Sequence, residues 1–587
     1  MCGIFAYLGN KNNAAELVFR GLQALEYRGY DSWGIAVKQN QKLLVEKHVG
    51  KIGSSHSQLP KSNLGIGHTR WATHGGVTTH NAHPHLDCRQ EIAVVHNGII
   101  ENFEELKKHL LKQGHTFSST TDTEVVPHLI EEHLKNEGFA SSVRDTFNQL
   151  KGLNAIVVLY APSREIIAAK TGSPLVVGKN GDNLFIASDS VGILNHAKNV
   201  LFLEDNHMVI LGDQTKLIRL PDGTPLVPHF QNLEWRFEEA EKGNFKHFLL
   251  KEIFEQPHVL ENIAQQYESQ ITQLSTLIKS AFGTFMIACG SASYAALYGV
   301  YLFSKVARRH VNFSIGSEFT YLEDYLTPKS LVIALSQSGE TMDVVLPIRE
   351  AKKKGSKIVA LVNVLGSTLY RLADYKILLG AGPEKAVIAT KSLTVKFALL
   401  ILLVYDMVGK LPTGKQLIIQ AENNVKSILK EEFLRKIKRL AKMLHKEEHI
   451  FVIGRGLSYP AALETTLKIK ETTYIHAEGF AGGELKHGVI ALVEKGTPVI
   501  TLAPNDETYD DIISNSQEIA ARGGVIIGIG PKNNKIFNVW LPTDDCGVAT
   551  TIPQIVIAQL LAYYLALERG IKDPDKPRNL AKSVTVK

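Results

Sequence analysis

The chain has 587 residues, of which 44% are hydrophobic and 21% charged, and its formal net charge is +6. This length predicts about two to four domains with well-buried cores, and so small a net charge, without a basic run, argues against a nucleic-acid partner. The four cysteines lie far apart and form no CxxC pair, which favours reduced thiols in a cytoplasmic protein over a disulfide framework.

The N-terminal stretch MCGIFAYLGN predicts neither a signal peptide nor a lipid anchor. It lacks a basic segment, its apolar run is short, and a lipid-modified cysteine would need an apolar region before it. The longest apolar run, 397–405, ends at Asp406 and falls short of the ~18 residues that a membrane-spanning helix needs. We therefore expect a buried helix there and no membrane association.

Residues 1–235 are predicted to form an α+β domain. The pattern of apolar residues favours an amphipathic helix over 15–27 and strands over 64–72 and 91–100. The segment 236–257 is charged and then helical in character, and we expect it to link this domain to the next.

From residue 258 the pattern is strand, turn and long helix, repeated, which predicts doubly wound α/β domains with parallel sheets. The segment FMIACGSASYAALY (285–298) resembles FVIGRGLSYPAALE (451–464), and VIALSQSGETMD (332–343) resembles VITLAPNDETYD (499–510). The spacing between copies is nearly the same for both motifs, so the second half contains an internal repeat.

The repeat predicts two copies of one α/β domain, at 258–425 and 426–570. The remaining segment, 571–587, is unusually apolar for a terminal tail, and we expect it to dock on the domains.

The two copies differ in the turn after their second matching strand. The first copy has SQSGET at 336–341, whereas the second has APNDET with Asp506. A turn rich in hydroxyls and backbone N–H groups that opens a helix can bind an anion, and an aspartate there would repel phosphate. We therefore expect phosphate in the first copy alone; the alternative is a surface turn with helix-capping residues.

Cys2 is a candidate N-terminal nucleophile. If Met1 is removed, Cys2 carries both a thiol and an α-amine with a pKa of about 8, which can act as general base. Asn97 and Gly98 are suited to form an oxyanion hole. Arg70 and Asp122 are suited to hold the carboxylate and ammonium groups of an amino-acid amide.

These motifs together resemble known families. The first domain resembles the class II, N-terminal-nucleophile glutamine amidotransferases. The motifs that carry this resemblance are MCGIF, LEYRGYDS (25–32), RWATHG (70–75), NAHPH (81–85), VVHNGIIEN (94–102) and TDTE (121–124). SQSGET resembles sugar isomerase (SIS) domains. ELKHG (484–488) and PRNLAKSVTV (577–586) narrow the resemblance to the amidotransferases that convert fructose 6-phosphate to glucosamine 6-phosphate.

The resemblance implies a glutaminase domain of N-terminal-nucleophile type, two SIS domains and a docked catalytic tail. It also implies glutamine and fructose 6-phosphate as substrates, no cofactor, and a homodimer formed through the sugar-isomerase half. A sugar-phosphate sensor that only binds is less favoured, because binding alone needs neither Cys2, Glu471 nor Lys582.

The resemblance assigns catalytic and binding residues as well. In the glutaminase, Cys2 attacks the amide and Trp71 gates an ammonia channel, with Thr73 and His74 beside the substrate. In the isomerase, Lys582 forms an imine with the open-chain ketose, His487 assists ring opening, and Glu471 moves a proton between C1 and C2, with Lys468 on the same helix face. The expected sugar-phosphate contacts are Ser291, Ser336, Gln337, Ser338 and Thr341.

Two short stretches depart from the family pattern. The family's Cys-Gly-Thr-Ser turn reads Cys289-Gly290-Ser291-Ala292-Ser293 here, so either Ala292 replaces a hydroxyl contact or an insertion lets Ser293 take its place. The family's Ser-Thr-Lys reads Ala389-Thr390-Lys391. Both changes concern sugar recognition, and they keep open the same chemistry on another ketose phosphate.

A metal site is not expected. His80, His83, His85 and Cys88 have spacings that zinc ligands can have. The matching segment of the family is not a metal site, however, and the sequence offers no second cluster.

Overall fold

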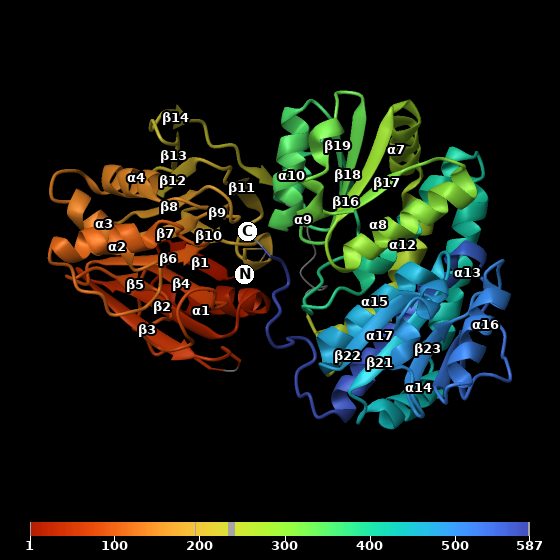
Figure 1. Cartoon of the computed structure of the whole chain (residues 1–587). Helices are drawn as coiled ribbons and strands as arrows, with labels where there is room; N and C mark the ends of the chain where they lie inside the picture. Colours follow the sequence, from red (N-terminus) through yellow and green to blue (C-terminus); the bar gives the residue numbers. More distant parts are fainter. Residues whose placement is uncertain (1, 54, 194, 233–240, 585–587) are drawn as a thin grey trace. The chain divides into compact units, whose positions relative to one another are not determined.

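The computed structural model describes residues 2–53, 55–193, 195–232 and 241–584 (Figure 1). The chain divides into two compact units, Met1–Glu238 with Ala581–Lys587, and Glu239–Leu580. Two sequence predictions fall partly outside the described residues: the removal of Met1, and the first five residues, 236–240, of the expected linker.

The first unit is built on two antiparallel sheets, of eight strands in the order β15-β11-β9-β10-β1-β4-β2-β3 and seven in the order β14-β13-β12-β8-β7-β6-β5. The strands of the first sheet are β1 (Gly3–Leu8), β2 (Ser32–Gln39), β3 (Lys42–Val49), β4 (Leu64–Arg70), β9 (Val176–Asn180), β10 (Asn183–Ala187), β11 (Asn199–Phe202) and β15 (Gln231–Asn232). Those of the second are β5 (His85–Leu86), β6 (Ile92–Asn97), β7 (Ala155–Tyr160), β8 (Ile166–Lys170), β12 (His207–Leu211), β13 (Lys216–Arg219) and β14 (Pro225–Leu226).

Helices cover the outer faces of both sheets. Helix α1 (Ala14–Leu25) packs on β1, β2 and β4, whereas α3 (Val125–His133) and α4 (Phe139–Gln149) pack on the second sheet and α2 (Phe103–Lys112) packs on α3. Alternate residues of β1, such as Ile4 and Ala6, enter the core between the sheets, while Phe5 faces α1. Both faces of β1 are therefore buried, which explains its almost continuous apolar sequence.

The central place of β1 positions the N-terminal cysteine. β1 pairs with β4, so Gly3 lies opposite Thr69, and Cys2 comes next to the end of β4. In the second sheet β6 ends at Asn97. The helix predicted over 15–27 and the strands predicted over 64–72 and 91–100 are confirmed by α1, β4 and β6.

The second unit contains two five-stranded parallel sheets, β17-β16-β18-β19-β20 and β22-β21-β23-β24-β25. Their strands are β16 (Gly283–Ala288), β17 (Asn312–Ile315), β18 (Ser330–Ser336), β19 (Lys357–Val362), β20 (Tyr375–Leu378), β21 (His449–Gly454), β22 (His476–Ala481), β23 (Pro498–Leu502), β24 (Val525–Gly530) and β25 (Val539–Pro542). The two sheets have the same strand order, which confirms the internal repeat and the doubly wound α/β fold.

Helices surround these sheets, and most of them, though not all, share one apolar core. They are α5 (Phe248–Phe254), α6 (Gln256–Gln266), α7 (Glu268–Ser280), α8 (Ser291–Leu302), α9 (Gly316–Phe319), α10 (Met342–Lys353), α11 (Thr368–Leu372), α12 (Lys391–Met407), α13 (Leu411–Ile428), α14 (Glu431–Leu444), α15 (Ser458–Thr473), α16 (Tyr509–Ala520) and α17 (Thr551–Glu568). The predicted buried helix at 397–405 is confirmed by α12. The segment Gly547–Glu568 is long and apolar enough to span a membrane, but 89% of its most apolar window is buried, as in a core helix.

The chain after α17 docks back on the second unit. The carboxylate of Asp575 accepts hydrogen bonds from the backbone N–H groups of Phe248, at 2.8 Å, and Leu249, at 2.7 Å. It thereby caps the N-terminus of α5, where backbone donors lack helical partners. The backbone N–H of Val387 donates to the Asp575 carbonyl at 2.9 Å. These contacts anchor residue 575, in agreement with the expected docking of the tail.

Candidate active sites

In the first unit, the Cys2 side chain lies against the residue that follows β4. Its Sγ accepts a hydrogen bond from the Trp71 backbone N–H at 3.2 Å. The Cys2 carbonyl accepts from Asn97 Nδ2 at 3.0 Å and from Arg28 Nε at 3.3 Å. The main chain of residue 2 is therefore held from several sides, and its half-buried thiol is directed toward the loop that begins at Trp71.

His68 orients the Asn97 amide. Its Nε2 lies 2.9 Å from the His96 carbonyl and 3.1 Å from Asn97 Oδ1. Both partners are acceptors, so Nε2 carries the proton, and burial lowers the pKa of His68 to about 3, which keeps the ring neutral. With Oδ1 occupied, Nδ2 is turned toward Cys2, and it carries two N–H groups, only one of which the Cys2 carbonyl needs.

His68 was missed by the sequence reasoning, although the sequence contains a signal for it. Leu64 and Ile66 point from β4 into the core between the two sheets, and His68 follows with the same alternation. A polar residue at an inward position of a fully buried strand needs a specific partner.

Arg70 lies among acidic groups and loop carbonyls. Its guanidinium donates to the carbonyls of His74, Gly75 and Gly76, and so supports the loop that also carries Thr73. Burial lowers the pKa of Arg70, against the opposing effects of Cys2, Asp31 and Asp122, which are close enough to raise it. Cys2, Arg70 and Asp122 therefore belong to one electrostatic neighbourhood.

The other glutaminase candidates lie on the surrounding loops. Asp122 Oδ2 accepts from the Ile100 N–H at 2.8 Å. Trp71 packs edge-on against Tyr30, and the His74 ring packs edge-on against Phe103. Gly98 has a φ of +135°, and a Cβ there would lie 2.4 Å from the Leu153 carbonyl oxygen, so the residue after Asn97 has to be glycine.

In the second unit, topology brings two candidate turns together. β16 and β18 are adjacent and parallel, so their carboxyl ends emerge side by side at the point where the strand order reverses. Ligands of doubly wound sheets bind at such a point. The turn after β16 leads directly into Ser291, the first residue of α8, and the turn after β18 is SQSGET.

The SQSGET turn is closed by its own hydroxyls. The Gly339 N–H donates to Ser336 Oγ at 3.0 Å, and the Glu340 N–H donates to Ser338 Oγ at 3.1 Å. Gly339 has a φ of +66°, and a Cβ there would lie 2.1 Å from Ser367 Oγ. Thr341 directly precedes α10, so the expected sequence of strand, turn and helix is confirmed.

The corresponding turn of the second copy contains a carboxylate side chain, that of Asp506. The Asp506 carboxylate accepts from the Thr508 N–H at 2.9 Å and from the Thr508 hydroxyl at 2.6 Å. Thr508 corresponds to Thr341 of the first copy. Donors that a phosphate would use there are therefore taken by a carboxylate, which fits the expectation that the second copy does not bind phosphate.

The stretches that depart from the family pattern have internal partners. The Ser293 hydroxyl is buried and donates to the Gly290 carbonyl at 2.7 Å, so its proton is used within the turn. Ser291, at the start of α8, is close enough to Glu464 to lower the pKa of that carboxyl, against the larger raising effect of burial. Lys391 Nζ forms a 2.6 Å ion pair with Glu255 Oε2.

Helix α15 carries a buried charge cluster. Lys468 Nζ lies 2.7 Å from Glu471 Oε2 and 3.3 Å from Glu464 Oε1. Burial raises the pKa of Glu464 to about 7, although Lys468 opposes this. Burial also disfavours the charge on Lys468, but the two carboxylates prevail and hold its pKa above the usual value. Glu464 was not singled out by the sequence reasoning; its spacing of four residues from Lys468 was the available signal.

Glu471 is the most accessible member of this cluster, with 19% of its side chain exposed against 1% for Lys468. His487 is exposed between the short helical turns Gly482–Lys486 and Val489–Leu492. Lys582 is half-buried in the segment Ala581–Lys587, which clusters with the first unit.

Known families and proteins match both units. The glutamine amidotransferase domain family matches residues 68–195, and the SIS domain family matches 277–405 and 443–568. Proteins named glutamine–fructose-6-phosphate aminotransferase [isomerizing] from Pyrococcus horikoshii and Thermococcus kodakarensis are 43% and 40% identical to this chain, over 100% of both chains in each case. The solved C-terminal domain of glucosamine-fructose-6-phosphate aminotransferase from Francisella tularensis covers 56% of this chain and 98% of its own, with 31% identity and a TM-score of 0.52.

The fold and these matches define a protein with a glutamine amidotransferase domain followed by two SIS domains. The sequence identity to the two relatives, which extends over the full length of this chain, narrows the class further. The chain belongs to the glutamine–fructose-6-phosphate aminotransferase (isomerizing) family.

Proposed function

We propose that this protein releases ammonia from glutamine and uses it to convert fructose 6-phosphate to glucosamine 6-phosphate. The observation that carries the proposal is the match, from end to end, to relatives named for this reaction. The arrangement of Cys2 beside Asn97 and the SQSGET turn at the strand-order reversal support it independently.

The glutaminase half-reaction uses Cys2 as nucleophile. After removal of Met1, the Cys2 α-amine takes the thiol proton, and Sγ attacks the carboxamide carbon of glutamine. The oxyanion accepts hydrogen bonds from Asn97 Nδ2 and the Gly98 N–H. Ammonia leaves with the transferred proton, and water then hydrolyses the thioester to glutamate and free thiol. Arg70 and Asp122 bind the substrate's carboxylate and ammonium groups.

The sugar half-reaction begins at the phosphate. Ser336, Gln337, Ser338 and Thr341 bind it, next to Ser291 at the start of α8. His487 assists ring opening, and the Lys582 amine condenses with the C2 carbonyl and releases water. Ammonia then adds at C2 and displaces the Lys582 amine, which leaves an imine of ammonia at C2. Glu471 moves a proton from C1 to C2, which gives the C1 aldehyde and the C2 amine, while Lys468, held cationic by its two carboxylates, fixes the Glu471 side chain.

Ammonia has to reach the imine without escaping to solvent, and we assign the gating of its path to Trp71, with Thr73 and His74 on the same loop. We also propose a cytoplasmic homodimer that forms through the sugar-isomerase half and needs no cofactor.

The direct test is product identification. Purified full-length protein that lacks Met1 is expected to convert glutamine and fructose 6-phosphate to equimolar glutamate and glucosamine 6-phosphate, as measured by mass spectrometry. When a panel of ketose phosphates is compared, fructose 6-phosphate should have the highest kcat/KM. Because Ala292 and Ala389 lack hydroxyls, a higher value for another ketose phosphate would favour the same chemistry on that sugar.

The orienting role of His68 gives a second test. Asn97→Ala should lower the glutaminase kcat by about 10²–10³-fold, as expected for the loss of one oxyanion donor. His68→Ala should lower kcat by up to about 10²-fold, because it frees the Asn97 amide to rotate.

The double variant separates positioning from general damage. If His68 acts through Asn97, the double variant should be no slower than Asn97→Ala alone. Multiplicative losses would contradict that role. Since the pKa of His68 is about 3, its protonation should not shape the pH profile of the wild-type rate above about pH 5.

A further inference from the structure

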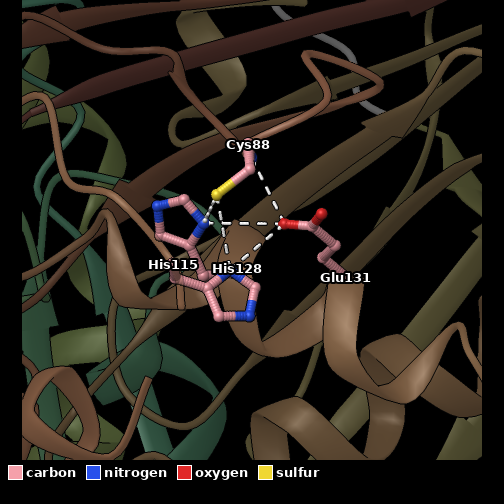
Figure 2. A group of neighbouring side chains, drawn as sticks. All are labelled: Cys88, His115, His128 and Glu131. Atoms are coloured by element: carbon pink, nitrogen blue, oxygen red, sulfur yellow. Dashed lines mark hydrogen bonds and ion pairs between the residues drawn. The ribbon is translucent and has the colours of Figure 1, made fainter. Parts of the chain in front are cut away.

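Four side chains with metal-binding atoms converge in the first unit (Figure 2). Cys88 follows β5, His115 lies in the loop after α2, and His128 and Glu131 are on α3. Their ligand atoms all lie within 4.8 Å of one another. Cys88 Sγ is 3.5 Å from His115 Nδ1 and 3.6 Å from His128 Nδ1. Glu131 Oε2 is 3.3 Å from His115 Nδ1 and 3.7 Å from His128 Nδ1.

These separations match the edges of a metal tetrahedron. Zinc binds sulfur at about 2.3 Å and nitrogen or oxygen at about 2.0–2.1 Å, so a tetrahedral site has S–N edges of about 3.6 Å and N–O edges of about 3.3–3.4 Å. Three of the four separations given above agree with these values within about 0.1 Å, and the fourth is about 0.3 Å longer. The two remaining separations are within 4.8 Å, so the four ligand atoms are close enough together to share one ion.

The hydrogen bonds around His115 leave a lone pair facing a carboxylate. His115 Nε2 lies 2.7 Å from Glu132 Oε1, so in the neutral ring Nε2 is the donor and Nδ1 the acceptor. Nδ1 then faces Glu131 Oε2, a second acceptor. A cation between them removes this conflict, and a carboxylate on the far nitrogen is the usual support of a metal-bound histidine.

The donor set selects the kind of metal. One thiolate, one carboxylate and two neutral imidazoles together balance a divalent charge. Thiolate and imidazole ligands suit zinc, whereas magnesium and calcium prefer oxygen ligands alone. Binding releases the Cys88 thiol proton to solvent, and Cys88 is exposed, which provides an entry path for the ion.

We propose that Cys88, His115, His128 and Glu131 bind one zinc ion that fixes the segment 115–128. Four protein ligands close the coordination sphere, so the ion is structural. The segment carries Asp122, the proposed ammonium-binding residue, and His115 and His128 lie at its two ends. The ion therefore stabilises the loop of the glutamine site by tying both of its ends to the strand that precedes Cys88.

The histidines nearest to Cys88 in the sequence do not belong to this cluster. His83 stacks on His68 at a ring distance of 4.2 Å, and His85 Nε2 lies 3.0 Å from Thr121 Oγ1. His80 is exposed. The residues that the fold brings to Cys88 are 27, 40 and 43 residues away from it in the chain, so the spacing of nearby residues did not indicate them.

The test measures metal directly on the full-length protein. The chain is stripped with a chelator, incubated with Zn²⁺ or Co²⁺, passed through a desalting column and analysed for bound metal. We expect one ion per chain, and with Co²⁺ a thiolate-to-cobalt charge-transfer band together with the strong visible bands of a tetrahedral site. Removal of zinc should lower the melting temperature and raise the KM for glutamine several-fold.

Matched variants locate the ion. Cys88→Ser should abolish the charge-transfer band, and Glu132→Gln should weaken zinc binding by roughly 10–100-fold, as for other carboxylates behind a histidine ligand. His80→Ala should change neither the charge-transfer band nor the affinity for zinc. Wild-type protein that keeps no ion after desalting, or that keeps it equally well in Cys88→Ser, would overturn the proposal; the first result would mean that the cluster is an imidazolium–carboxylate network. The wild-type measurements do not depend on how the variants fold.

Discussion

Replacing Cys2 with alanine is expected to abolish glutamine hydrolysis and glutamine-dependent synthesis, while the sugar half-reaction continues. Loss of a covalent nucleophile typically costs on the order of 10⁴–10⁶-fold in rate. Apart from Lys582, the sugar candidates lie on turns and helices of the second unit, whereas the Cys2 thiol contacts the Trp71 backbone in the first. Glutamate release and the interconversion of fructose 6-phosphate with glucose 6-phosphate should be measured on the same preparation.

The sugar reaction is the internal control for this variant. An alanine at position 2 keeps the main chain that β1 and Asn97 hold, so the fold should survive. Loss of both activities together would contradict separate sites. Retained glutaminase activity would exclude Cys2 as the nucleophile.

Replacing Lys582 with arginine is expected to reduce sugar turnover to background and to leave glutamine hydrolysis measurable. A guanidinium remains protonated at any working pH and cannot attack the C2 carbonyl, whereas a lysine amine can lose its proton. The substitution keeps the positive charge and much of the side-chain volume. A loss of sugar turnover is therefore due to the lost reactivity of the amine rather than to altered packing. Product formation should be followed by mass spectrometry with saturating glutamine.

A trapping experiment gives the prediction a positive readout. Borohydride added with fructose 6-phosphate should reduce the imine and attach the sugar phosphate to the peptide that contains Lys582, and the arginine variant should show no such adduct. Lys572→Arg is the matched control, because Lys572 is exposed nearby in the chain and its carbonyl, rather than its amine, contacts His247. Full turnover by the Lys582 variant would remove this lysine from the mechanism.

The periodic parts of the fold were predictable from local sequence. The apolar run in α12 is buried on all sides, so its pattern was visible without any knowledge of its neighbours. The repeat was visible because both copies need the same strand, turn and helix, and the Asp506 substitution already indicated different chemistry in the second copy. His68 and Glu464 were missed because their importance comes from what they touch, Asn97 and Lys468, and not from a motif.

The amino-acid sequence by itself determined the order of domains, the nucleophile candidate at position 2 and the chemical difference between the two sugar turns, because each depends on residues that are close together in the chain. Tertiary structure alone decided which groups face one another across long loops. β4 brings the Trp71 N–H to the Cys2 thiol, and the packing of α3 brings His128 and Glu131 to Cys88. Such contacts form when buried strands and helices pack, and the spacing of residues along the chain does not encode them.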